Sequence, residues 1–448
     1  MNSATPRSAV WMSVAALLVA GSALAKDYYV SAQRGRGRTG SKEKPASDLG
    51  NIISKLAPGD TVHIAAGTYL GRGKSGADAI LVPVSIIGGY SDDFSRRDPW
   101  GEFKTVLTGD VTTKNYKVSP RLHIDLAKYL YHKSGGTAMP KIVVDGLILD
   151  QGPQNRYKDA GKALLVRKAN PKTGESPTPD RGALVITASR TKNRAGKWDI
   201  AVRNCVVVNS APTQGALTVS GYQGSTVTIE NNLVINNTGT GIYAGSMWQG
   251  RDEAGAPRFT IRNNTVLFTE KYDAFAQSFS GNSLKVGGAV VAAVSNNVLA
   301  FADRNGVQKE GKWKLLLKDN LIVGNVQADY WEVSGDQKIE LEAIEDEAEY
   351  LDEESTGNVA TKIRVPVPEA WAKLYASRVL IDRNAAAADI KAQRTKANAL
   401  RSILGLPLRA DDLKADSPVW LPLMKVEDAI RAGADKYGGK YGSSMPKG

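Results

Sequence analysis

The sequence is poor in the residues that build disulfide frameworks and metal sites. Its 448 residues include one cysteine and three histidines. A single cysteine, Cys205, excludes an internal disulfide, so packing and hydrogen bonds must hold the fold. The histidines show no His-Glu-x-x-His spacing and there is no cysteine pair, which argues against a zinc site. The absence of Gly-x-Ser-x-Gly likewise disfavours a serine hydrolase with a nucleophile elbow.

Long apolar runs are also scarce. One run, Val14 to Leu24, follows a basic residue and is short for a membrane span. The small residues Ala23 and Ala25 at its end fit the Ala-x-Ala pattern that signal peptidase accepts. We therefore predict a signal peptide over residues 1–25, cleaved before Lys26. No later stretch is apolar over the roughly 18 residues that a transmembrane helix needs, so we expect an exported protein, periplasmic or secreted.

Acidic charge is concentrated in one segment. The chain has 58 Lys and Arg against 46 Asp and Glu, a net charge of +12. The segment from Asp329 to Glu354 contains twelve acidic residues and one basic residue, Lys338, so the rest of the chain is strongly basic. Outside the cytoplasm such a surface favours acidic polysaccharides over nucleic acid, although scattered lysines can also serve solubility alone. The acidic run matches no known calcium loop, and Ca²⁺ binding stays open.

A strand, bend, strand pattern recurs along the middle of the chain. Its clearest copy is Thr228-Ile-Glu-Asn-Asn-Leu-Val-Ile-Asn. One residue at the bend recurs after 27, 32, 33 and 23 residues, which indicates a repeat with insertions. These marker residues are Asn204, Asn231, Asn263, Asn296 and Asp319.

Only stacked neighbours could bury the apolar side chains of each copy. We expect Val227, Ile229, Leu233 and Ile235 to point inward. The residues that follow the markers then lie in register, where stacked amides can hydrogen-bond as a ladder. The pattern predicts an all-β fold, a right-handed parallel β-helix. The ladder positions are Cys205, Asn232, Asn264, Asn297 and Asn320.

Helical segments are expected at both ends of the coils. Ser47 is a plausible N-cap of a short helix that covers the N-terminal end. Residues 368–404 read as helical, with Trp371, Leu374 and Tyr375 on one face. The predicted regions are the signal peptide 1–25, a β-helix domain with its cap 26–335, and an acidic connector with a mixed, largely helical extension 336–448.

The opening of the chain resembles a known superfamily. The segments Tyr28-Tyr-Val-Ser, Ala57-Pro-Gly-Asp-Thr-Val-His-Ile-Ala-Ala-Gly-Thr-Tyr and Ile87-Gly-Gly-Tyr, with the Asn-Asn bends, are similar to bacterial right-handed β-helix proteins of the pectate-lyase-like superfamily. The resemblance spans roughly residues 27–335 and implies the fold. It leaves activity open, because members include lyases, hydrolases, epimerases and proteins without a known reaction. The chain lacks the Asp and His clusters of polygalacturonase-like members and the arginine motifs of the best-known pectate lyases.

One constellation of charged and aromatic residues remains. Lys271 and Arg304 each lie eight residues after a marker, so successive coils should bring them together as a basic pair. Tyr243, Phe275 and Gln308 are expected to stack on the outer face beside them. The other candidate substrate-binding residues are Trp248, Arg251 and Gln277.

These residue types suit β-elimination from a uronate sugar. In that hypothesis Arg304 neutralises the carboxylate, Lys271 removes the proton and Tyr272 protonates the leaving oxygen. The alternative is a non-catalytic envelope or matrix protein that uses the same face to bind polyanionic glycans. Either way we expect a monomer with an acidic polysaccharide as partner and no identified metal ligands.

Overall fold

The computed structural model describes residues 25–71, 77–109, 120–126, 141–153, 182–188, 197–212, 214–271, 280–311, 313–339, 351–360, 367–376, 386–409, 422–437 and 439–446. Residues 1–24 of the predicted signal peptide lie outside these ranges. In the ranges given, no helix combines the length and apolar character that a membrane crossing requires.

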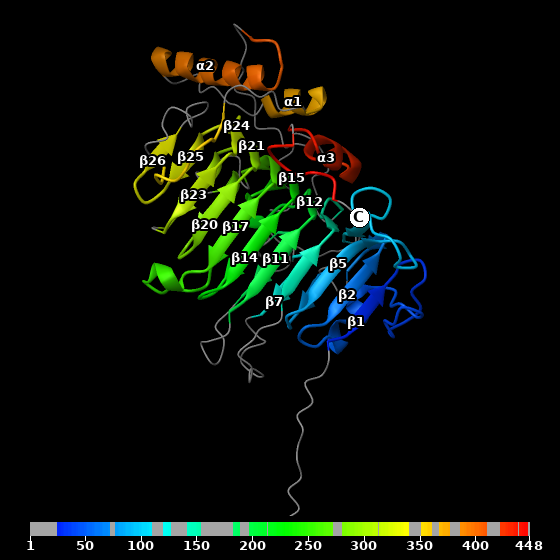
Figure 1. Ribbon diagram of the computed structural model, residues 1–448. Helices are drawn as coiled ribbons and strands as arrows, with labels where there is room; N and C mark the ends of the chain where they lie inside the picture. The colour runs from blue at the N-terminus through cyan, green and yellow to red at the C-terminus, as the bar shows by residue number, and fades with distance from the viewer. Residues whose placement is uncertain are drawn as a thin grey trace, which may run out of the picture.

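From β2 to β25 the chain visits three sheets in rotation (Figure 1). In the described residues, sheet A contains nine strands, sheet B eight and sheet C nine. These strands pair in parallel with the strand one turn earlier or later, so consecutive coils stack strand on strand at about 4.8 Å, and β26 closes sheet C by pairing antiparallel with β25. This arrangement is a parallel β-helix, as the asparagine repeat predicts.

The strands have the following bounds. Sheet A contains β1 Asp27–Val30, β2 Thr61–Ala65, β5 Ser85–Tyr90, β8 Ile142–Asp145, β11 Asp199–Arg203, β14 Thr226–Glu230, β17 Arg258–Arg262, β20 Val291–Ser295 and β23 Leu315–Lys318. Sheet B contains β3 Gly67–Tyr69, β6 Thr105–Leu107, β9 Leu147–Asp150, β12 Val206–Val208, β15 Leu233–Thr238, β18 Thr265–Glu270, β21 Val298–Ala302 and β24 Leu321–Val323. Sheet C contains β4 Asp78–Ile80, β7 Leu122–Asp125, β10 Leu184–Thr187, β13 Gly215–Gly221, β16 Thr240–Ser246, β19 Asn282–Gly287, β22 Asn305–Glu310, β25 Ala328–Glu332 and β26 Gln337–Ile339.

The core is built from rows of apolar residues that stack along the solenoid. One such row runs through sheet A in continuous register, and each member is at most 1% exposed. Burial of each branched side chain contributes roughly 1.5–3 kcal/mol, but only when the neighbouring coils are in place. The row consists of Val202, Ile229, Ile261, Val294 and Leu317.

The predicted amide ladder lies at the bend between sheets A and B. The Asn264 backbone N–H donates to Asn297 Oδ1 at 2.9 Å, and its side-chain Nδ2 donates to the same oxygen at 2.9 Å. The neighbouring rungs repeat this geometry from Asn232 to Asn320. Cys205 occupies the first rung, where its N–H donates to Asn232 Oδ1 at 3.0 Å. Burial raises the pKa of its thiol to about 12, so this cysteine is unreactive.

The marker residues adopt a left-handed backbone, and this corrects part of the inward-facing prediction. Asn231 has φ of 53°, and the turn it makes shifts the strand phase between the sheets. Val227 and Ile229 face the interior as expected. Leu233 and Ile235 instead pack on the outer side of sheet B with the C-terminal extension. The alternation is therefore interrupted at each bend.

The N-terminal cap differs in detail from the prediction. Two short 3₁₀ turns, η1 Leu49–Asn51 and η2 Ile53–Lys55, replace the expected helix. The N-cap is Asp48, whose side chain accepts from Gly50 N at 2.8 Å, while the Ser47 hydroxyl accepts from the Asn51 side chain. The apolar residues of this segment still join the interior core.

The predicted acidic connector contains a further rung of the ladder. The Asn320 N–H and Nδ2 donate to Asn358 Oδ1 at 3.1 and 2.9 Å. Parallel bridges join Lys318 to Thr356 and Leu321 to Val359. Coiling thus continues beyond the boundary drawn at residue 335. The 38-residue gap before this rung hid it from the spacing argument.

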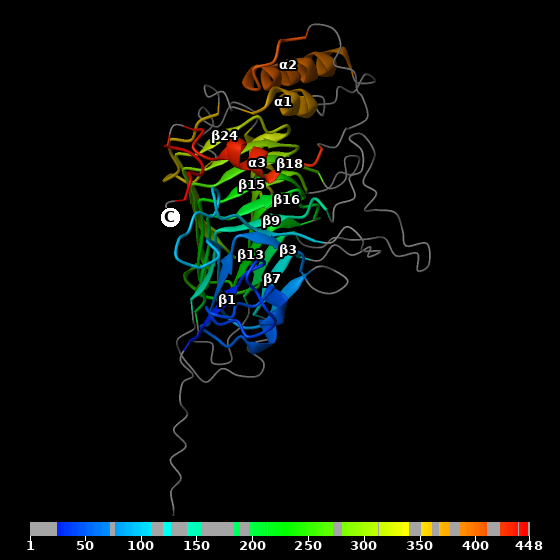
Figure 2. The ribbon, with the colours of Figure 1, turned by 90° about the vertical axis from the view of Figure 1, so that its right-hand side faces the viewer.

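The C-terminal extension packs partly on the outer side of sheet B and partly beyond β24 at the end of the solenoid (Figure 2). It includes α1 Glu369–Ala376, α2 Ala387–Ile403 and α3 Val426–Gly433. Tyr375 of α1 is fully buried against the stacked rings of Phe268 and Phe301, and Trp371 and Leu374 pack beside it. The extension and the solenoid therefore share one apolar cluster.

Replacing Asn264 with Ala should strongly destabilise the protein. The change leaves the Asn232 N–H and the Ile229 carbonyl without their partners inside the core. We expect the free energy of unfolding in urea to fall by about 2–5 kcal/mol. Thr260→Ala on the exposed side of sheet A is the control and should change it by less than about 0.5 kcal/mol. Equal stabilities of the two variants would contradict the ladder's role.

Candidate functional site

The outer side of sheet C carries a row of polar and aromatic residues, one from each coil. The register pairs Tyr243 with Lys285, Lys285 with Gln308, and Gln308 with Trp331. Glu310 lies two residues beyond Gln308 on the same side of β22. We call Tyr243, Lys285, Gln308 and Glu310 the Glu310 cluster. The stacking of β16, β19 and β22 brings these residues together although 67 positions separate the first from the last.

Two donors in the cluster converge on one carboxylate oxygen. Lys285 Nζ and Gln308 Nε2 each lie 2.7 Å from Glu310 Oε1. Lys285 Nζ also lies 5.8 Å from the centroid of the Tyr243 ring. Within the described part of the chain, Glu310 Oε2 accepts no hydrogen bond, so one face of the carboxylate remains available to a donor.

Gln308 is the most unusual member of the cluster. Its side chain is 0% exposed, and its carbonyl Oε1 has no hydrogen-bond partner among the described residues. An unpaired buried acceptor costs about 1–3 kcal/mol. Five other buried polar atoms of the described residues also lack a partner, so this carbonyl does not by itself mark a binding site.

Glycines hold the Tyr243 ring close to the sheet. A side chain at Gly245 or Gly287 would meet the ring at 3.0 Å, and a side chain at Gly215 would meet Tyr243 Cβ at 2.6 Å. The ring therefore occupies space that glycines of its own strand and of the two neighbouring strands leave empty. Burial, and second the charge of Glu310, raise the pKa of Tyr243. At neutral pH the phenol is a hydrogen-bond donor and not a base.

The predicted basic pair lies at the corner where sheet B passes into sheet C. Arg304 N donates to Gly281 O at 2.8 Å, and a side chain at Gly281 would meet Lys271 Cγ at 3.0 Å. Lys271 N also donates to the buried carboxylate of Asp303 at 2.8 Å. Adjacent coils therefore bring Lys271 and Arg304 to one corner.

Arg304 is held in a fixed position at this corner. Its Nε donates to Gln327 Oε1 at 2.6 Å, and its guanidinium carbon lies 4.9 Å from the centroid of the Trp331 ring. Burial lowers the pKa of Arg304, which nevertheless stays cationic at neutral pH. Trp331 pairs with Gln308 in the register, so the contact with Trp331 places Arg304 beside the row that begins at Tyr243.

Two other predicted residues lie at the far end of the strands. Trp248 and Arg251 follow the C-terminal end of β16, whereas Arg304 precedes the N-terminal end of β22. The seven residues of β16 span roughly 20 Å, so the structure does not bring these two groups together. Three predicted residues, Tyr272, Phe275 and Gln277, lie outside the described residues.

The row also corrects the predicted neighbours of Tyr243. The position assigned to Phe275 is held by Lys285, because β19 begins only at Asn282 and the insertion precedes it. Lys285 and Trp331 were therefore missed, whereas Glu310 was expected further along the same face. The pattern Asn282-Ser-Leu-Lys-Val-Gly has the alternation of a strand and could have revealed this register.

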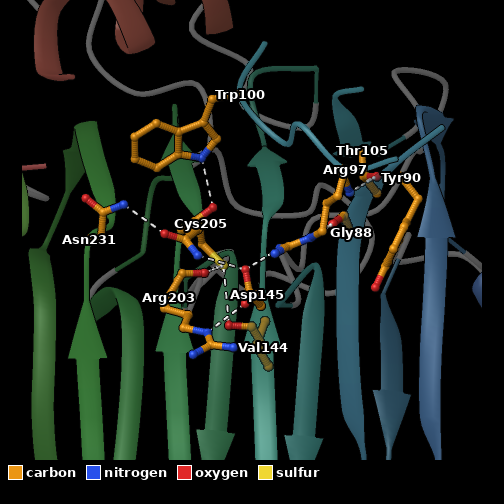
Figure 3. A network of polar contacts seen from close by, with 12 residues as sticks. Gly88, Tyr90, Arg97, Trp100, Thr105, Val144, Asp145, Arg203, Cys205 and Asn231 are labelled. Carbon is orange, nitrogen blue, oxygen red and sulfur yellow. Dashed lines mark hydrogen bonds and ion pairs between the residues drawn. The ribbon is translucent and has the colours of Figure 1, made fainter. Parts of the chain in front are cut away.

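A second polar cluster surrounds Asp145 and has a structural explanation. Figure 3 shows this carboxylate, 1% exposed, between Arg97 and Arg203. Asn204 Nδ2 also donates to it at 3.0 Å, and Trp100 Nε1 donates to Asn204 O at 2.8 Å. The two arginines and the amide satisfy the carboxylate and fasten the segment around Trp100 to the bend. We therefore assign it to the fold.

A third candidate lies on the outer side of sheet A near the N-terminus. His63 Nε2 lies 2.9 Å from Asp27 Oδ1, and His63 Nδ1 lies 3.1 Å from the Tyr90 hydroxyl. The Tyr29 ring stacks on the imidazole with centroids 5.0 Å apart. Burial raises the pKa of Tyr90, so its phenol is a poor base at neutral pH. These contacts fasten β1, β2 and β5 together.

In the ranges described, no three His, Cys, Asp or Glu side chains are grouped so as to hold a metal ion. No protein-family profile and no curated protein matches the sequence. A solved structure described as "The complex structure of XylC with xylose" matches 68% of this chain and 69% of that chain, with 11% identity and a TM-score of 0.23. A similarity this low carries no argument about ligand or activity.

Gln308→Met should leave stability unchanged or raise it. The substitution keeps the side-chain length and removes the unpaired carbonyl, at the expense of one hydrogen bond to Glu310. We expect the free energy of unfolding in urea to stay within about 0.5 kcal/mol of the parent value or to increase, as is common where function opposes stability. A loss of more than about 1.5 kcal/mol would show that Gln308 serves the fold.

Proposed function

We propose that this chain is an exported, right-handed parallel β-helix protein of the pectate-lyase-like type that binds an acidic polysaccharide along the outer side of sheet C. The observation that carries this proposal is the row of Tyr243, Lys285, Gln308 and Trp331 along the outer side of sheet C, with Arg304 against Trp331. Glu310 Oε2, which accepts no hydrogen bond in the described part of the chain, can accept from a sugar hydroxyl.

The composition of the row supports a sugar polymer. Tyr243 and Trp331 offer ring faces, which pack against the apolar faces of sugar rings. One functional side chain per coil gives a spacing of about 4.8 Å along the solenoid. That period is close to the length of one sugar unit, so a chain lying along the axis meets an equivalent position at each coil.

The charges at the site favour an acidic polymer. Arg304 and Lys271 lie at the corner beside the row, and Lys285 lies within it. The net charge of +12 adds long-range attraction for a polyanion. Because Glu310 already neutralises Lys285, Arg304 is the cation assigned to the uronate carboxylate.

Cleavage is the second part of the proposal. In β-elimination a base removes the proton beside the uronate carboxylate, the bond to the leaving oxygen breaks, and that oxygen is protonated. We assign carboxylate neutralisation to Arg304, proton removal to Lys271 and protonation of the leaving oxygen to Tyr272. The contacts of Gln308, Glu310 and Arg304 support binding more directly than cleavage, so a glycan-binding protein without activity is the alternative.

Lys285→Gln and Arg304→Gln should weaken binding to uronate polymers, because the first leaves the negative charge of Glu310 unbalanced and the second removes the cation assigned to the uronate carboxylate. We expect each to raise the dissociation constant for polygalacturonate or alginate about 10- to 100-fold in isothermal titration calorimetry, with weaker binding at higher salt. Arg262→Gln on sheet A is the matched control and should bind like the parent. A neutral xylan should bind weakly. Preferential binding of the neutral polymer, or normal affinity in both variants, would contradict the proposal.

If the protein is a lyase, incubation with uronate polymers should generate unsaturated products with ultraviolet absorbance. Lys271→Ala should then remove activity, while Lys271→Ala still binds the polymer because Arg304 and the Glu310 cluster remain. Undiminished turnover in Lys271→Ala would reject it as the base. Binding without any product across the polymer panel, with and without Ca²⁺, would assign the chain to the non-catalytic alternative.

A further inference from the structure

The backbone nitrogen of Lys26 is held by a buried carboxylate. Asp60 is 2% exposed, and its Oδ1 lies 2.8 Å from Lys26 N. Its Oδ2 accepts from Ala57 N at 2.8 Å. Lys26 O in turn accepts from Thr61 N at 2.9 Å, and β1 begins at the next residue. Lys26 therefore has both backbone polar groups fixed at the edge of the first coil.

Asp60 lacks the partner that a buried carboxylate usually has. In the part of the chain that the structure describes, it forms no ion pair with a Lys, Arg or His side chain. Both of its oxygens accept only backbone N–H groups. Buried carboxylates are seldom found without a cation, because taking the charge out of water is costly.

The sequence places the leader cleavage at the same nitrogen. The small residues Ala23 and Ala25 predict hydrolysis of the peptide bond before Lys26. Water adds across that bond, the new carboxylate leaves with the leader, and Lys26 N becomes a protonated amine. The contact with Asp60 then changes from a neutral donor on a carboxylate to an ion pair, which is the stronger interaction.

We propose that Lys26 is the mature N-terminus and that its α-ammonium pairs with Asp60, so that processing itself locks the first coil. The locked strand, β1, is the terminal strand of sheet A, and on its outer edge Gly40 and Ala46 bond to the backbone of Tyr29, so its first residues are the part with a neighbour on one side only. Terminal elements of repeat proteins open most easily, so an added ion pair has its largest effect there.

Few other titratable groups face this contact. From β1 these are Asp27 and Tyr28, and from β2 His63, which lies 2.9 Å from Asp27. The Tyr28 hydroxyl donates to Lys55 O of η2, and burial, followed by the charge of Asp60, raises the pKa of Tyr28. All of these groups are present before and after cleavage. A comparison of the two forms therefore measures the effect of the α-amino group alone.

The test compares hydrogen exchange of β1 in two forms of the full mature chain. One form begins at Lys26, and the other retains residues 22–25, so that residue 26 carries an amide. We expect the β1 peptide to exchange about tenfold more slowly in the first form, and a peptide of β14 to exchange equally in both. Asp60→Asn keeps an acceptor but removes the charge. It should abolish the difference between the forms.

The pH dependence has a defined sign. Pairing raises the pKa of the α-amino group above its unfolded value of about 8, so the extra protection is present below pH 8 and is lost as the pH rises through the raised value. N-terminal sequencing of the exported protein should give Lys26 first. A different first residue, equal β1 exchange in the two forms, or an equal effect of Asp60→Asn on both would overturn the proposal.

Discussion

The amide ladder at the bend between sheets A and B is the constraint on which the other features depend. Each ladder asparagine donates its backbone N–H to the side-chain oxygen of the next rung, and its side-chain nitrogen donates to a backbone carbonyl of the preceding coil, so the coils can stack in one register only. Slipping one coil by a residue would leave two buried amides unpaired and turn the apolar row outward. The ladder therefore fixes the positions of residues that lie far from it, including those on sheet C.

The site on sheet C is a consequence of that register. Nothing local in the sequence brings Tyr243, Lys285 and Glu310 together, because each belongs to a different coil. The longer connections lie before or after the strands of sheet C, as between β16 and β17 and between β18 and β19, whereas the bend that carries the ladder keeps two residues between its strands. The fold thus has a stacked framework that tolerates few substitutions and an outer row whose polar residues can vary without disturbing the core.

The sequence predicted the framework well and the site in part. Asparagine spacing identified the rungs from Cys205 to Asn320, since stacked amides leave a regular pattern. Spacing failed where an insertion hid the register, so Phe275 was expected where Lys285 lies and Asn358 was overlooked. It also failed at the bends. The left-handed conformation of Asn231 reverses the strand phase, which sends Leu233 toward the helical extension. Alternation alone contains no signal for such a reversal.

The strand that closes sheet C has an implication for assembly. β26 runs antiparallel to β25, whereas every other pairing between named strands in the described residues is parallel. To continue the solenoid, a second molecule would have to add a strand parallel to the edge strand of the last coil. At sheet C the edge strand is β26, which runs in the opposite direction. At sheet C, the hairpin thus makes end-to-end polymerisation into fibres unfavourable, and the solenoid can carry many identical rungs without becoming a template for its own copies.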